Sequence, residues 1–147
     1  MKTRGVLNPE LQKVIAHMGH GDMLVIGDRG CPFPRHDMTT CIDLSVSRGI
    51  PAVVDVVKAV LEDLEIESAI IANETKTVSP HIYSAFKELL SAKKNKGNDI
   101  VEENIPHVDF KHLFLNGPLE GKEVKAFVKT GEFTPYANII LVSGVDF

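Results

Sequence analysis

The order of apolar segments in this 147-residue chain predicts a single-domain α/β fold, a mixed sheet with flanking helices. Short apolar runs of strand length alternate with longer segments in which apolar residues recur every three or four positions. Such alternation is typical of one sheet covered by helices. No repeat, linker or low-complexity segment divides the chain, and this length most often forms one domain. We therefore predict a single domain over residues 1–147.

Prolines mark the starts of four predicted helices. Asn8 supplies an N-cap and Pro9 a first helical residue, a position where the missing N–H of proline costs nothing. Pro51 opens a segment whose many valines would also suit a strand, but its spacing and length favour a helix. The predicted helices cover residues 8–19, 51–64, 79–97 and 106–116.

Apolar runs between these helices predict the strands. Ile66 to Ala72 is the clearest strand, and Met23 to Ile26 reads as a short buried one. Residues 28–40 hold two prolines and several polar side chains, which predicts an ordered loop. Further extended segments are expected at residues 41–46, 99–102 as an edge strand, 124–129 and 138–142.

The composition excludes several classes of protein. The net charge is −4, the pI is near 5.8 and no basic stripe is visible, so nucleic-acid binding is not expected. No apolar run approaches the ~18 residues of a membrane-spanning helix, and the first residues lack the apolar region of a secretory signal. Cys31 and Cys41 form no metal-like pair and are expected to be free thiols. The expected location is the cytoplasm.

A phenol and a carboxamide lie close together near the C-terminus. The segment Thr134 to Asn138 runs into the apolar stretch Ile139 to Val142, and an extended backbone would put Tyr136 and Asn138 on one face. Both groups donate and accept hydrogen bonds, as the hydroxyls of a sugar require. The alternative is an edge strand opened by a turn at Pro135, in which Tyr136 packs and Asn138 caps the strand.

Three further residues could contribute proton transfer or binding. His20 precedes the strand at residues 23–26 and Asp28 follows it, and working residues of α/β folds gather at strand ends and loops. His107 follows Pro106 in the first turn of a predicted helix, where the helix dipole disfavours an imidazolium ion. Taken singly, each could instead be a turn or helix-start residue exposed to solvent.

Other kinds of site find no support in the sequence. No serine lies in a Gly-x-Ser-x-Gly elbow, and neither a Walker-type phosphate loop nor a Gly-x-Gly-x-x-Gly motif occurs. His17 and His20 are three residues apart, but no carboxylate completes a metal motif and Gly19 is expected to end the helix between them. We expect no metal and no cofactor, which leaves general acid–base chemistry.

Six segments in order along the chain carry a resemblance to a known family. They are Gly5 to Asn8, Met18 to Asp22, Asp28 to Pro34, Ile42 to Leu44 with Gly49 to Pro51, Thr130 to Glu132, and Thr134 to Leu141. Together they resemble the D-ribose pyranase and L-fucose mutarotase family over essentially the whole chain. The resemblance implies a ribose pyranase-like fold and a ring-shaped homo-oligomer, a decamer in the pyranase branch, with sites shared between subunits.

The resemblance also implies roles for single residues. The histidine of the Gly-His segment, His20, corresponds to the proton donor of the family. The sugar-contacting residues correspond to Asp28, His107, Tyr136, Ala137 and Asn138, with Ala137 able to offer only its main chain.

The two branches of the family are both represented in the sequence. Met18 to Asp22 is more similar to the fucose branch, whereas the Pro-Phe-Pro loop and Pro135 to Asn138 are more similar to the ribose branch. The expected activity is interconversion of the β-pyranose and β-furanose forms of free D-ribose by acid–base ring opening. The alternatives are a mutarotase for L-fucose or another aldose, a non-catalytic sugar-binding accessory of an uptake system, and a metal-dependent sugar isomerase.

Overall fold

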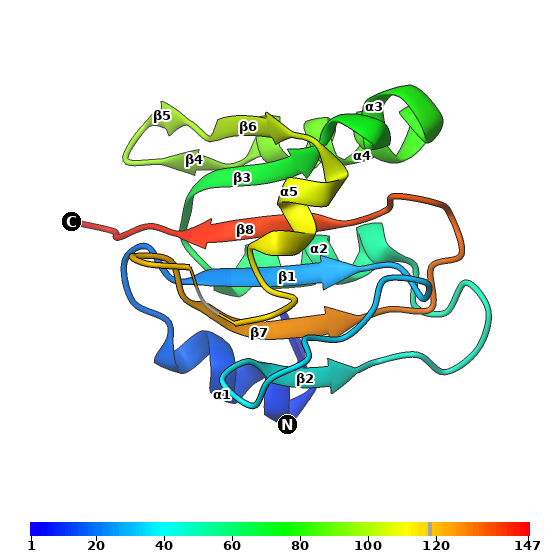
Figure 1. Ribbon diagram of the computed structural model, residues 1–147. Coiled ribbons are helices and arrows are strands. Elements are labelled where there is room, and N and C mark those ends of the chain that lie inside the picture. Colours follow the sequence, from blue (N-terminus) through cyan, green and yellow to red (C-terminus); the bar gives the residue numbers. More distant parts are fainter. Residues whose placement is uncertain (118) are drawn as a thin grey trace.

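A six-stranded sheet forms the centre of the molecule. The computed structural model describes residues 1–117 and 119–147. The strands of this sheet are β1 (Met23–Gly27), β2 (Thr40–Asp43), β3 (Ile66–Ala72), β6 (Val101–Ile105), β7 (Val124–Lys129) and β8 (Ile139–Ser143). They lie in the order β2-β7-β1-β8-β3-β6 (Figure 1).

The direction of β8 decides which loops meet. β8 runs antiparallel to both of its neighbours, β1 and β3, whereas the other neighbouring strands pair in parallel. Ile139, the first residue of β8, is paired with Ile26 on one side and with Ile71 on the other. The segment before β8 therefore lies at the carboxyl ends of β1 and β3. This mixed sheet confirms the predicted fold class.

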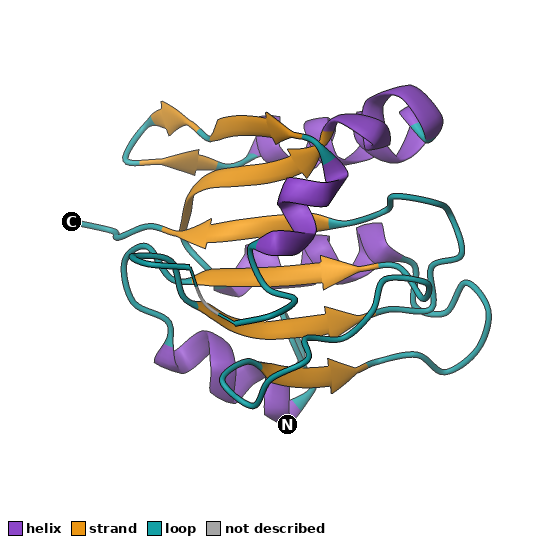
Figure 2. Cartoon of the chain, viewed as in Figure 1, coloured by secondary structure: helices purple, strands orange, loops and turns teal. Residues whose placement is uncertain are grey.

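Helices cover the two faces of the sheet unequally. The helices α1 (Pro9–His17), α2 (Val53–Asp63) and α4 (Pro80–Ala92) pack on one face. The short helix α5 (His107–His112) crosses the opposite face, where the loop after β1 also lies (Figure 2). Another short helix, α3 (Asn73–Val78), directly follows β3 at the carboxyl edge of the sheet.

The core is divided into two layers by the sheet. In β1 every residue is buried, with Leu24 and Ile26 in one layer and Met23 and Val25 in the other. A strand buried on both faces reads as a continuous apolar run, which is why Met23 to Ile26 was recognisable from the sequence. Phe110 of α5 has no exposed surface and anchors that helix in the thinner layer.

Most predicted elements are confirmed, but several details of the prediction are wrong. The helix predicted over residues 106–116 ends at His112, and the extended segment predicted at residues 41–46 is β2, at residues 40–43. The helix α3 was missed because residues 73–78 show no apolar periodicity. The helix expected to close near Gly97 ends at Ala92, since Lys93 is extended, and a small hairpin of β4 (Lys94–Asn95) and β5 (Asn98–Asp99) follows. The edge strand is β6 at residues 101–105 rather than 99–102. The valine-rich segment after Pro51 is indeed helical.

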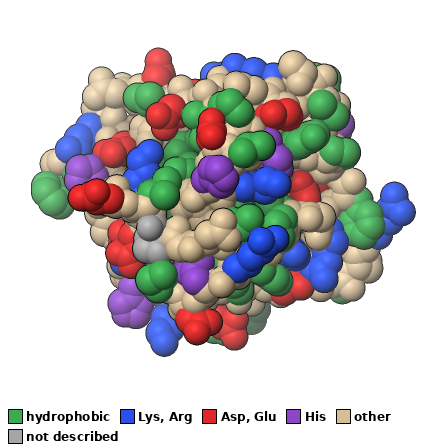
Figure 3. All heavy atoms as spheres, viewed as in Figure 1, with side chains coloured by type: hydrophobic (Ala, Val, Ile, Leu, Met, Phe, Trp, Pro, Cys, Tyr) green, Lys and Arg blue, Asp and Glu red, His purple; other side chains and the backbone are tan. Residues whose placement is uncertain are grey.

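The surface agrees with the charge pattern of the sequence. On the face that carries α5, acidic and basic side chains are interspersed (Figure 3). In the part of the chain that the structure describes, no helix is both long enough and apolar enough to cross a membrane. Cys31 and Cys41 are free thiols, the first buried and the second exposed.

Candidate functional site

A cavity of about 260 Å³ opens at the carboxyl end of β1, and four of the predicted binding side chains line it. These are Asp28, His107, Tyr136 and Asn138. They come from the loop after β1, the start of α5 and the segment before β8. The fifth predicted residue, Ala137, is fully buried between Tyr136 and Asn138. The topology thus brings together residues that are more than a hundred positions apart.

Asp28 and Asn138 form the floor of this cavity. The backbone N–H of Asp28 donates to Asn138 Oδ1 at 2.9 Å, and Asn138 Nδ2 donates to Asp28 Oδ2 at 2.8 Å. The other carboxylate oxygen of Asp28 accepts from the N–H groups of Gly30 and Cys31. A carboxylate offers about four acceptor positions, so Asp28 retains capacity for a ligand hydroxyl.

Tyr136 reaches the cavity from a turn, not from a strand. Its φ of 57° places it in the left-handed region, and β8 begins only at Ile139. The prediction that Tyr136 and Asn138 share one face of an extended segment is therefore wrong. The alternative of a turn at Pro135 describes the backbone better. Both side chains nonetheless line the same cavity.

His107 stands at the start of α5 with its ring against Tyr136. The two ring centroids are 4.9 Å apart in an edge-to-face arrangement. Burial lowers the pKa of His107, nearby Lys111 lowers it further, and the carboxylates of Glu74 and Asp28 oppose this shift. Among the described residues, the buried Nδ1 has no hydrogen-bond partner. A ring held neutral near pH 7 both donates and accepts hydrogen bonds.

Among the lining residues that were not predicted as functional, Lys111 and Cys31 carry ionisable side chains. Lys111 lines the cavity one helical turn after His107. The four-residue spacing was the signal that could have identified it, because such positions share one helix face. Cys31 also lines the wall, and burial raises the pKa of its thiol to about 12. A thiol that stays protonated is no nucleophile at neutral pH.

Arg29 points away from this cavity. Its guanidinium donates to Asp43 Oδ2 at 2.6 Å and to Ser45 Oγ at 3.0 Å. The hydrogen bond from Arg29 lowers the pKa of Asp43 to about 2. Arg29 is therefore engaged in an ion pair beside the cavity, and Asp28 rather than Arg29 lines the cavity wall.

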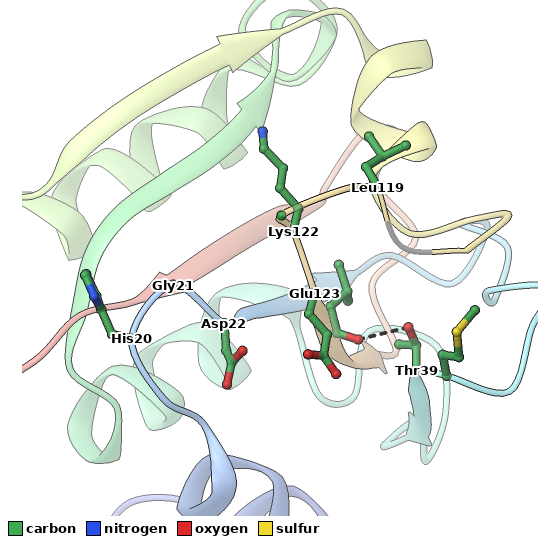
Figure 4. A pocket seen from close by; sticks show the side chains of 10 residues that line it. His20, Gly21, Asp22, Thr39, Leu119, Lys122 and Glu123 are labelled. Atoms are coloured by element: carbon green, nitrogen blue, oxygen red, sulfur yellow. Dashed lines mark hydrogen bonds between the residues drawn. The ribbon is translucent and has the colours of Figure 1, made fainter.

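His20 is not part of this cavity within one chain. It precedes β1, whereas Asp28 follows it, and the five residues of β1 at about 3.3 Å each separate the two by roughly 16 Å. His20 instead lines a second hollow of about 470 Å³ with Asp22, Lys122 and Glu123. Figure 4 shows His20 at the margin of this hollow, across from the loop that carries Lys122.

One carboxylate holds the ring of His20. Its Nε2 lies 2.9 Å from Glu67 Oε2, and both side chains are partly exposed. Glu67 is the second residue of β3, so the pair joins the start of β1 to the start of β3. Within residues 1–117 and 119–147, no group of three His, Cys, Asp or Glu side chains could hold a metal ion.

Comparison with known proteins gives the family. Residues 1–146 match the RbsD / FucU transport protein family. The chain belongs to this family. Curated members named D-ribose pyranase include that of Aliivibrio fischeri strain MJ11, 43% identical over 148 residues, and that of Clostridium perfringens strain SM101, 42% identical over 147 residues. Each alignment covers all of both chains.

Solved structures of the RbsD / FucU family have the same fold. Bacillus subtilis RbsD complexed with D-ribose is 37% identical, with a TM-score of 0.83 and full coverage of both chains. The Streptococcus pneumoniae fucose mutarotase in complex with L-fucose is 24% identical, with a TM-score of 0.70 over 95% of this chain and 94% of that one. The second likeness concerns the fold alone. The identities place this chain nearer to the ribose members.

Proposed function

We propose that this protein is a D-ribose pyranase, which interconverts the β-pyranose and β-furanose forms of free D-ribose in the cytoplasm. The observation that carries the proposal is the convergence of Asp28, His107, Tyr136 and Asn138 on one cavity. Its volume of about 260 Å³ lies below the ~300–1,000 Å³ typical of sites for drug-sized ligands. Such a cavity, lined by donors and acceptors, suits a small polyol.

The reaction needs only proton transfers. A base takes the proton of the C1 hydroxyl while an acid delivers a proton to the ring oxygen O5, the C1–O5 bond breaks, and O1 becomes the oxygen of an aldehyde. The open chain rotates, and the C4 hydroxyl adds to C1, losing its proton to a base as O1 regains one. General acid–base catalysis typically accelerates such steps about 10²- to 10⁴-fold.

In this mechanism His20 supplies the proton and the cavity residues bind the sugar. Asp28 accepts hydrogen bonds from the sugar hydroxyls, and Asn138 donates to them. His107 and Tyr136 can both donate and accept further hydrogen bonds. Since roughly 16 Å separate the two ends of β1, His20 must act on a sugar held by a second copy of the chain. We therefore propose a homo-oligomer, with a decamer as the expected form, in which each site is shared between copies.

Saturation-transfer NMR on free D-ribose tests the activity. The wild-type protein should produce exchange between pyranose and furanose signals beyond the uncatalysed rate. His20→Ala should abolish this enzyme-dependent exchange but leave the fold and assembly intact. His17→Ala is the matched control, because His17 is exposed on α1 and its Nδ1 lies 2.8 Å from Lys13 O of the same helix. Exchange at the wild-type rate in His20→Ala would show that His20 is not the proton donor.

Mixed assemblies test whether the site is shared. His20→Ala retains an intact sugar cavity, and His107→Ala retains an intact His20. If each site combines two copies, refolding the two inactive variants together should restore part of the activity. No recovery in verified mixed assemblies would contradict the shared site.

The same measurements separate the alternatives. A panel of ribose, fucose, galactose and glucose distinguishes a ribose enzyme from a fucose mutarotase. A non-catalytic sugar-binding accessory would bind ribose without enhancing exchange. A metal-dependent isomerase would lose activity with a chelator, whereas acid–base catalysis by His20 would not.

A further inference from the structure

We propose that α3 is the positioning element of the sugar cavity, with Thr75 and Glu74 fixing Tyr136 and His107 in their places. Neither residue lines the cavity. Glu74 and Thr75 are consecutive in α3, and they hydrogen-bond to the backbones of His107 and Tyr136, respectively. Ser79, just after α3, hydrogen-bonds to the turn that contains Pro135 and Tyr136. The inference rests on the proposed function, because the role that it gives to Thr75 and Glu74 is to position residues that bind the sugar.

Thr75 holds the turn that presents Tyr136. Its side chain is fully buried, and Oγ1 donates to the carbonyl oxygen of Tyr136 at 2.7 Å. Tyr136 has a left-handed backbone, which is unfavourable for an L-residue and persists only where the surroundings enforce it. The hydrogen bond from the buried Thr75 hydroxyl to the carbonyl oxygen of Tyr136 is a contact that can hold this backbone conformation.

Ser79 reinforces the same turn from the end of α3. It is 1% exposed, and its Oγ donates to the carbonyl oxygen of Pro135 at 2.6 Å. Two neighbouring carbonyls of the turn are therefore held by two buried hydroxyls four residues apart. This attachment holds the backbone from which the Tyr136 side chain extends into the cavity.

Glu74 holds the other side of the cavity. Its Oε2 accepts from the backbone N–H of His107 at 2.8 Å. This N–H belongs to the first turn of α5 and has no partner within the helix, so the carboxylate satisfies it from outside. A negative charge is also favourable at a helix N-terminus. Glu74 thereby fixes where α5 begins and where the His107 ring stands.

These contacts bear on binding because His107 and Tyr136 touch each other. Their rings are 4.9 Å apart, although 29 positions separate them in sequence. Both are attached through α3 to the end of β3, a strand inside the sheet. A cavity held in its binding geometry loses less entropy when the sugar binds. Loosening either attachment should therefore weaken binding more than it slows the proton transfers.

A pair of substitutions at Thr75 tests the inference. Thr75→Val keeps the shape but removes the hydrogen bond, and Thr75→Ser keeps the hydroxyl. We expect Thr75→Val to raise the KM and the Kd for D-ribose about three- to tenfold, with kcat within about twofold of wild type, and Thr75→Ser to restore most of the affinity. The control is Thr77→Val, the same change at an exposed position of α3.

A purely structural role predicts a different result. In that case Thr75→Val would lower the melting temperature but leave the ribose Kd unchanged, which would overturn the inference. If Thr75→Val does not fold, Glu74 decides: Glu74→Ala should weaken ribose binding and Glu74→Gln, which keeps an acceptor oxygen, should weaken it less. Equal affinity of wild type and Glu74→Ala would then overturn the inference. Failure of the wild-type protein itself to bind ribose would instead contradict the proposed function.

Discussion

Asp28 and Asn138, 110 positions apart in the sequence, exchange two hydrogen bonds at the carboxyl end of β1. One runs from main chain to side chain and the other joins the two side chains, so the amide of Asn138 has a single useful orientation. The pair joins the loop after β1 to the start of β8 with less than a tenth of either residue exposed. It is at once part of the fold and the floor of the cavity.

Asn138→Ala should destabilise the protein and abolish ribose binding. The substitution leaves the buried N–H of Asp28 without its acceptor, which typically costs about 1–3 kcal/mol. Chemical denaturation measures the free energy of unfolding, and calorimetry measures the ribose affinity. Asn95→Ala is the control, since Asn95 lies in the β4–β5 hairpin and donates to Glu65 Oε1 and the carbonyl oxygen of Val145, away from the cavity. Normal affinity in Asn138→Ala would remove Asn138 from the proposed site.

Gly27→Ala should displace the Asn138 side chain from its hydrogen bonds with Asp28. A Cβ at Gly27 would lie 2.6 Å from Asn138 Oδ1 and 3.0 Å from Phe127 Cζ, so the Asn138 side chain must move. Overpacking of this kind typically costs about 1–3 kcal/mol. We expect lower stability together with weaker ribose binding. In Gly19→Ala the nearest atom would be 3.8 Å away, and that variant should keep wild-type stability.

The lowered pKa of His107 predicts a stability change below neutral pH. The unfolded chain takes up a proton near pH ~6.5, whereas the folded protein does so only at a lower pH. Between these values the unfolded state binds more protons, so the free energy of unfolding falls as the pH falls. His107→Gln should lose this part of the pH dependence. The free energy of unfolding of both proteins is measured by chemical denaturation between pH 7.5 and pH 5. The same pH dependence in wild type and His107→Gln would refute the assignment.

Glu67→Ala should reduce the turnover number modestly. The carboxylate of Glu67 orients the ring of His20 across 2.9 Å, but both groups are partly exposed, and such pairs contribute about 0.2–1 kcal/mol. We therefore expect kcat to fall by at most about fivefold with KM nearly unchanged, because the cavity residues are untouched. Glu67→Gln, which can still accept a hydrogen bond, should fall less. A KM effect alone would place Glu67 in sugar binding.

Local patterns in the sequence were sufficient for most of the helices and strands. Asn8 and Pro9 carry their own signal, since the Asn8 side chain accepts from Leu11 N at 3.0 Å. α3 carried no such signal. Its first turn is stabilised by contacts with residues far along the chain, through Glu74 to His107 and Thr75 to Tyr136. Contacts between residues so far apart in the sequence cannot be predicted from a local sequence pattern.

The sequence by itself determined the α/β class and the set of polar residues available for a sugar, because apolar periodicity and residue chemistry are local properties. Only the tertiary structure decided which of these residues meet. The antiparallel insertion of β8 between β1 and β3 brings Asn138 and Tyr136 to Asp28, and α3 holds Tyr136 beside His107. The same sheet leaves His20 at the opposite end of β1, since a strand keeps its two ends a fixed distance apart.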